Sequence, residues 1–158
     1  MNMEREKRVI ILIILIILVI SSMGFILINS FMDYQHSHDT SGVITDIIIS
    51  TDDMNEWDHT DMIVRKLAHV IEYAFLGFSA TCLLIFISRI YRLRFYGCGF
   101  FFVLFIAVID EHIQSFSDRI SSTADILLDF VGAIIGASFA FILAFIIAAI
   151  AKKKKANI

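Results

Sequence analysis

Three ionisable residues stand at helical spacing in the stretch RKLAHVIEYAFLG, which covers residues 65–77. Arg65, His69 and Glu72 are separated by four and three residues, so on an α-helix they share one face. A histidine or carboxyl group can act as a general base or acid, and an arginine can bind a phosphate or carboxylate through two parallel hydrogen bonds. The pattern therefore predicts either a catalytic site or an anion-binding site.

Two later stretches carry further groups of this kind. The stretch DEHIQ begins with two carboxylic acids, and STADILLD contains two more at helical spacing. The side chains predicted to act in catalysis are His69 or Glu72 as the general base and Asp110 or Glu111 as the acid. The side chains predicted to act in binding are Arg65, Lys66, Tyr73, Gln114, Arg119, Asp125 and Asp129.

The elements that must position these residues are apolar helices. The chain of 158 residues is 58% hydrophobic with 15 Phe and no Pro, and its mean hydropathy of +0.81 is too high for an ordinary soluble domain. A helix needs about 20 mainly apolar residues to cross the roughly 30 Å hydrocarbon layer. Four segments qualify, at about 9–28, 67–88, 95–116 and 125–151. The sequence predicts an all-α fold, a single membrane domain over 1–158 built as a bundle of four transmembrane helices.

The basic residues predict the orientation of this bundle. Ten of the 13 Lys and Arg residues precede the first predicted helix, join the second to the third, or follow the fourth. Short cytoplasmic loops are enriched in Lys and Arg, so both termini are predicted to be cytoplasmic. The predicted outer segment, 29–64, contains eight acidic residues and no Lys or Arg, which agrees with that orientation.

The predicted topology brings the ionisable groups of three helices to one level near the outer surface. Charged side chains at this depth are costly in lipid, so they should turn inward and meet one another. We therefore predict a polar pocket open to the extracytoplasmic side. Gly132 and Gly136 form a G-x-x-x-G pattern, which allows close approach of a neighbouring helix.

The outer segment itself contains a pattern typical of a short amphipathic helix. Apolar residues stand at positions 43, 44, 47 and 48, which is the spacing of one helical face. Such a helix can lie on the membrane surface or cap the contents of the bundle.

The blocks RKLAHVIEYAFLG and DEHIQSFSDRISSTADILLDFVGAIIG resemble the VanZ-like family of small bacterial membrane proteins. The family pattern is a basic-x-x-His-x-x-Glu-Tyr block, an Asp-Glu-x-x-Gln block and a closing block with Arg, Asp and two Gly, and both the order and the spacing fit. The resemblance also extends to Ser30 and Ser41 in the outer segment. It marks Lys66, His69, Glu72, Tyr73, Asp110, Glu111, Gln114, Arg119, Asp125, Gly132 and Gly136.

The chain departs from the family pattern in two places. Ser117 and Asp118 stand where the family usually has Pro-Gly, so the family pattern does not give the shape of this outer turn. Asp129 stands where the family often has Asn, so a neutral amide is replaced by a carboxyl group.

The resemblance implies a role in the bacterial cell envelope, in the plasma membrane, including resistance to glycopeptide antibiotics of the teicoplanin type. It implies no established reaction, and it leaves the cofactor unknown. Three hypotheses stay open: a pocket that binds an anionic envelope lipid or peptidoglycan precursor, a membrane-embedded enzyme acting on a lipid-linked phosphate or amide, and a structural scaffold. The enzyme can be metal-assisted, since the site offers nitrogen and oxygen ligands for zinc or a harder cation. The lipid bilayer is the predicted surrounding, and nothing in the sequence indicates nucleic-acid binding.

Overall fold

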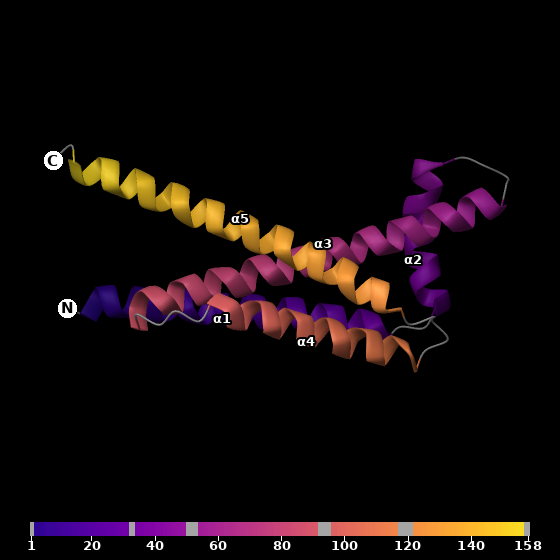
Figure 1. Ribbon diagram of the computed structural model, residues 1–158, viewed down its shortest axis with the longest axis horizontal. Coiled ribbons are helices and arrows are strands. Elements are labelled where there is room, and N and C mark those ends of the chain that lie inside the picture. Colours follow the sequence, from indigo (N-terminus) through magenta and orange to yellow (C-terminus); the bar gives the residue numbers. More distant parts are fainter. Residues whose placement is uncertain (1, 32–33, 50–53, 92–95, 117–121, 157–158) are drawn as a thin grey trace.

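The computed structural model describes residues 2–31, 34–49, 54–91, 96–116 and 122–156 (Figure 1). All regular structure within these ranges is α-helical. The helices are α1 (Asn2–Phe31), α2 (Tyr34–Ile48), α3 (Met54–Tyr91), α4 (Tyr96–Gln114) and α5 (Thr123–Ala156). The all-α prediction is confirmed.

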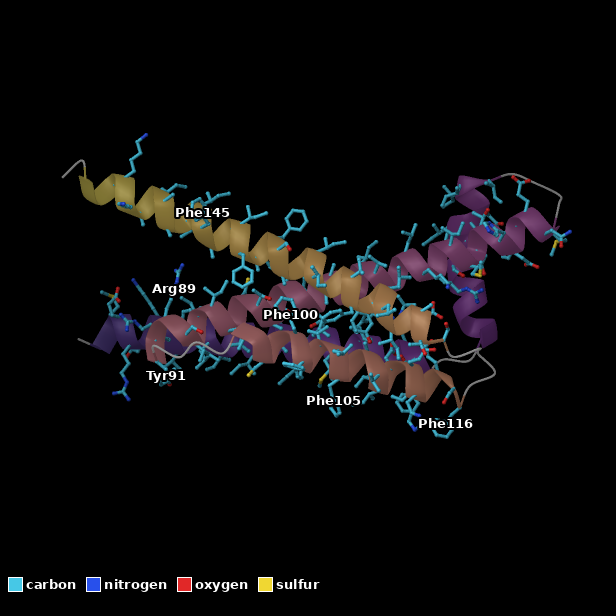
Figure 2. All side chains as sticks on the ribbon, viewed as in Figure 1. Arg89, Tyr91, Phe100, Phe105, Phe116 and Phe145 are labelled. Atoms are coloured by element: carbon cyan, nitrogen blue, oxygen red, sulfur yellow. The ribbon has the colours of Figure 1, made fainter. Side chains whose placement is uncertain are left out.

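Four of these helices are long and apolar enough to cross a membrane. They are α1, α3, α4 and α5, which correspond to the four predicted spans. Large apolar side chains cover their outer surfaces, for example Ile17 on α1, Phe105 on α4 and Phe145 on α5 (Figure 2). In water this surface would be strongly unfavourable, whereas acyl chains can cover it.

The helix α3 is the central element of the bundle. It packs against each of the other four described helices, most extensively against α5. The helices α1 and α4 lie against each other along α3, and Figure 1 shows α5 crossing α3. Both termini lie at one end of the bundle, and α2 lies at the opposite end, which we call the polar end.

Two helix boundaries differ clearly from the predicted ones. The helix α3 begins at Met54 rather than near residue 67, and α1 begins at Asn2 rather than near residue 9. The added residues are mostly polar, and an apolar run marks only the part of a helix that lies in lipid. No Pro interrupts either segment, so the backbone hydrogen bonding continues past the apolar run.

Glycines allow α3 and α5 to touch backbone to backbone. A Cβ atom on Gly136 would lie 1.7 Å from the carbonyl oxygen of Ala74, and one on Gly132 would lie 2.5 Å from that of Val70. From the α3 side, a Cβ on Gly77 would lie 2.3 Å from the carbonyl oxygen of Ala133. The close helix approach predicted from the G-x-x-x-G pattern is therefore confirmed.

The predicted amphipathic helix in the outer segment is present as α2, which begins earlier than the apolar pattern suggested. Its apolar side is exposed, with Val43 64% and Ile47 80% accessible. On its polar side, Ser41 and Thr45 are buried against α3. At the exposed edge of this contact, the Trp57 indole donates a hydrogen bond of 2.7 Å to Asp46 Oδ1. The apolar face is thus turned away from the protein, as expected for a helix that lies on a membrane surface.

We expect Gly136→Ala to destabilise the bundle, because the added Cβ meets backbone that cannot move aside without separating α3 from α5. Overpacking of this kind costs about 1–3 kcal/mol or more. Thermal unfolding in detergent should show the loss as a lowered Tm. Gly24→Ala on α1 is the matched control, since a Cβ there meets nothing within 4 Å. Equal Tm values for the two variants would contradict the packing described above.

Candidate functional site

Three transmembrane helices bring polar side chains together at the polar end. Tyr73 on α3 donates a hydrogen bond of 3.1 Å to Asp110 Oδ2 on α4, and His69 Nδ1 lies 3.9 Å from the same oxygen. Asp129 on α5 completes the group, because ligand-type atoms of His69, Asp110 and Asp129 all lie within 4.8 Å of one another. Tyr73 and Asp110 are 0% exposed and Asp129 is 3% exposed. We call these four residues the central cluster.

Helix geometry explains why these four residues meet. His69 and Tyr73 are one helical turn apart, so both face the same neighbours. Asp129 precedes Gly132 by three residues and shares its face, which is the face that touches the α3 backbone. The glycine contact therefore carries the Asp129 carboxyl group to the side of α3 that bears His69.

The first helix contributes to the site through one hydrogen bond. The Asn29 side-chain amide on α1 donates to Glu72 Oε1 on α3 at 2.9 Å. An amide group at this depth is destabilising unless it has a hydrogen-bond partner. This bond therefore fixes α1 against α3 and orients the Glu72 carboxyl group.

An ion pair lies at the outer edge of the site. Lys66 Nζ on α3 is 2.8 Å from Asp125 Oδ1 in the first turn of α5. The two side chains are 46% and 29% exposed. Exposed pairs of this kind contribute little to stability. Because almost half of the Lys66 side chain is exposed, its ammonium group is accessible to a ligand from outside the bundle.

A second buried polar group lies between α2 and α3. Asp61 is 0% exposed and accepts hydrogen bonds from Ser41 and from Thr45 Oγ1, the latter at 3.4 Å. Arg65 Nε lies 3.4 Å from the other Asp61 oxygen. We call Ser41, Thr45, Asp61 and Arg65 the α2 anchor, since they attach the polar side of α2 to the body of the protein.

The adjacent acidic residues of α4, Asp110 and Glu111, have different hydrogen-bond partners. Asp110 faces the central cluster, whereas Glu111 Oε1 accepts a hydrogen bond of 2.5 Å from the backbone N–H of Ser122. The Ser122 hydroxyl in turn accepts from the Ala124 N–H at 3.1 Å, which is the contact of a helix N-cap. Glu111 thus helps to position the start of α5.

The remaining predicted residues are more peripheral. Gln114 is the last residue of α4 and is partly exposed. Arg119 lies outside the described residues. The central cluster therefore unites His69, Tyr73, Asp110 and Asp129 from the predicted set, and Lys66 with Asp125 forms its outer edge.

Sequence reasoning missed two residues of the site. Asp61 is four residues before Arg65 and eight before His69, so its place on their face was visible in the spacing. It was overlooked because it precedes the apolar run. Asn29 gave no comparable signal, since a polar residue at the end of an apolar segment is expected in any case.

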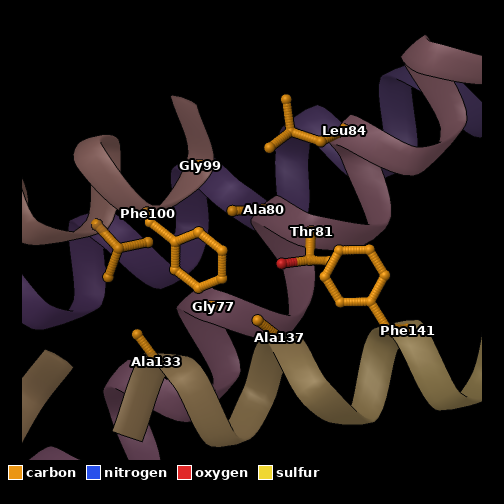
Figure 3. A pocket seen from close by; sticks show the side chains of 10 residues that line it. Gly77, Ala80, Thr81, Leu84, Gly99, Phe100, Ala133, Ala137 and Phe141 are labelled. Atoms are coloured by element: carbon orange, nitrogen blue, oxygen red, sulfur yellow. The ribbon is translucent and has the colours of Figure 1, made fainter. Parts of the chain in front are cut away.

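A small apolar cavity lies between α3, α4 and α5, closer to the termini (Figure 3). Its walls include Ala80 of α3, Phe100 of α4 and Phe141 of α5, with Thr81 as a polar member. Such a lining offers no acid, base or anion-binding group. The central cluster, by contrast, lies at the polar end.

Comparison with known protein families identifies the chain. A family model described as VanZ/LLP1 matches residues 12–146. The chain belongs to the VanZ/LLP1 family. The resemblance seen in the sequence is thus confirmed, and the match includes every residue of the central cluster. The corresponding searches of curated proteins and of solved structures gave no match.

In this VanZ/LLP1 protein we expect Asp61→Asn to loosen α2 without unfolding the transmembrane bundle. Hydrogen bonds to a charged group contribute about 1.5–3 kcal/mol, so local opening of α2 should become roughly 10–100 times more frequent. Hydrogen exchange of residues 41–48 reports this directly.

Asp58→Asn serves as the control for this measurement, because Asp58 is an exposed acid on the same part of α3. Unchanged exchange in Asp61→Asn would show that the α2 anchor does not hold the helix.

Proposed function

We propose that this VanZ/LLP1 protein binds an anionic component of the bacterial cell envelope at its polar end and thereby contributes to resistance against glycopeptide antibiotics of the teicoplanin type. The ligand is a lipid-linked phosphate or a peptidoglycan precursor carrying a carboxylate. The observation that supports this best is the accessible Lys66 ammonium group at the outer edge of a buried polar cluster. Arg65, one residue earlier, is partly exposed beside it.

The distribution of charge supports an extracytoplasmic polar end in the plasma membrane. The Lys and Arg residues of the described ranges mostly lie toward the end of the bundle that holds the two termini, as Arg89 does in Figure 2. Positively charged flanks of this kind favour the cytoplasmic side. The polar end then faces the compartment in which envelope precursors are exposed.

The chemistry of Lys66 suits such a ligand. An ammonium group has three donors, and a single Asp125 oxygen occupies one of them in this structure. A phosphate offers several acceptor oxygens and a larger charge, so it can replace the carboxylate partner or share it. The apolar tail of a lipid ligand would remain in the bilayer against the exposed apolar helix surfaces.

A membrane-embedded enzyme is the second candidate. It is favoured by the convergence of His69 with Asp110 and Asp129, which places a base beside two acids. Substrates of the proposed enzyme are a lipid-linked phosphate or amide. Release of inorganic phosphate from a polyprenyl phosphate by the wild type, lost in His69→Gln, would favour this reading over binding alone.

We expect Lys66→Gln to weaken binding of a polyprenyl phosphate at least tenfold, because one charged hydrogen bond of about 1.5–3 kcal/mol is lost. Native mass spectrometry of the protein in nanodiscs gives the bound fraction at several lipid concentrations. Lys152→Gln at the opposite end is the matched control and should bind like the wild type.

The uncharged polyprenol separates headgroup recognition from binding of the apolar tail. The proposed function requires much weaker binding of polyprenol than of polyprenyl phosphate by the wild type. Equal binding of the two lipids, or unchanged binding in Lys66→Gln, would contradict it.

A further inference from the structure

The central cluster contains two carboxyl groups, Asp110 and Asp129, and one imidazole, His69. Among the described residues, Arg65 and Lys66 are the Lys and Arg side chains within one helical turn before His69 on α3. Both of these bases already pair with carboxylates outside the central cluster. Asp129 therefore has no Lys or Arg partner among the described residues.

Asp129 is the most informative of these residues. It is 3% exposed, its carboxylate is turned toward His69 and Asp110, and it makes no hydrogen bond or ion pair with any residue that the structure describes. A buried carboxylate is costly unless it is paired, hydrogen-bonded or bound to a metal. Its position beside a second buried carboxylate increases that cost.

The spacing of the three side chains fits a cation between them. His69 Nδ1 and Asp110 Oδ2 are 3.9 Å apart, too far for a hydrogen bond. Metal bonds of about 2.0–2.2 Å to imidazole nitrogen and carboxylate oxygen hold neighbouring ligand atoms roughly 3–4 Å apart. The complete set lies within 4.8 Å, so small side-chain movements suffice to close around an ion.

We propose that His69, Asp110 and Asp129 bind one divalent transition-metal ion, with zinc as the ion that best suits one nitrogen and two oxygen ligands. The three ligands come from α3, α4 and α5, so the ion joins the three helices at the polar end. Three protein ligands leave a coordination position for water or for an oxygen of a bound anion. Tyr73 is the positioning residue, since its hydroxyl group orients the Asp110 carboxyl group.

The metal site adds to the proposed headgroup binding and is testable without it. Its ligands are separate from Lys66, and metal binding needs no lipid phosphate. A metal-free protein can still bind a headgroup through Lys66, and a protein that does not bind the headgroup can still bind the metal.

The test is zinc binding by the purified full chain in nanodiscs, after removal of metal with EDTA. We expect about one zinc ion per chain by elemental analysis, and a dissociation constant from competition with a fluorescent chelator. Asp129→Asn keeps the size of the side chain but removes a charged ligand, and it should raise the dissociation constant at least tenfold. His69→Gln should do the same.

Asp58→Asn is the matched control, because it makes the same change at an exposed acid near the start of α3, away from the central cluster. It should bind zinc like the wild type. Less than a fifth of an equivalent bound to the wild type, or equal affinity in Asp129→Asn and Asp58→Asn, would overturn the proposal and assign any bound metal to exposed histidines or cysteines.

Cobalt substitution keeps the proposal testable if a ligand variant fails to fold. The wild type loaded with Co²⁺ should show visible d–d absorption without a thiolate charge-transfer band, as expected for nitrogen and oxygen ligands. A thiolate band would place the metal at Cys82 or Cys98 and overturn the assignment.

Discussion

The contact between the backbones of α3 and α5 is the constraint on which the rest of the structure depends. Gly132 and Gly136 bring α5 so close to α3 that a single methyl group would meet a carbonyl oxygen. In lipid, where the hydrophobic effect does not drive helices together, such close packing supplies much of the attraction. The same contact fixes the depth and rotation of α5, and hence where Asp129 lies relative to His69.

The lipid surroundings explain why the polar side chains gather on α3. A charged or amide group that faced the bilayer would be unfavourable by several kcal/mol, so each must turn to the helix that offers partners. The helix α3 touches all four other described helices, and it provides partners for α1 at Glu72, for α2 at Asp61 and for α4 at Tyr73. The part of α3 that precedes its apolar run contains Asp61, and α2 attaches to α3 there.

The sequence predicted the features that depend on regular spacing. The four spans, the close approach at Gly132 and the shared face of His69 with its neighbours follow from helical periodicity and the thickness of the bilayer. Other features depend on details of rotation between helices, which periodicity does not contain. Adjacent residues on α4 point about 100° apart, and only packing decides that Asp110 faces α3 while Glu111 caps the chain before α5. The roles of Asn29 and Asp61 depend on partners from distant parts of the chain.

The polar end has an ordered arrangement of charge that connects the two proposals. Its accessible outer edge carries the ammonium group of Lys66, whereas its buried centre carries two carboxylates and an imidazole. The ammonium group at the outer edge attracts anions, whereas the carboxylates at the centre repel them. An anionic headgroup can therefore reach the centre only if positive charge is present there. A metal ion bound by His69, Asp110 and Asp129 supplies that charge. Because Asp129 stands where the family pattern often has Asn, a centre of this kind depends on the carboxylate that distinguishes this chain, while the outer basic edge follows the common pattern at Lys66.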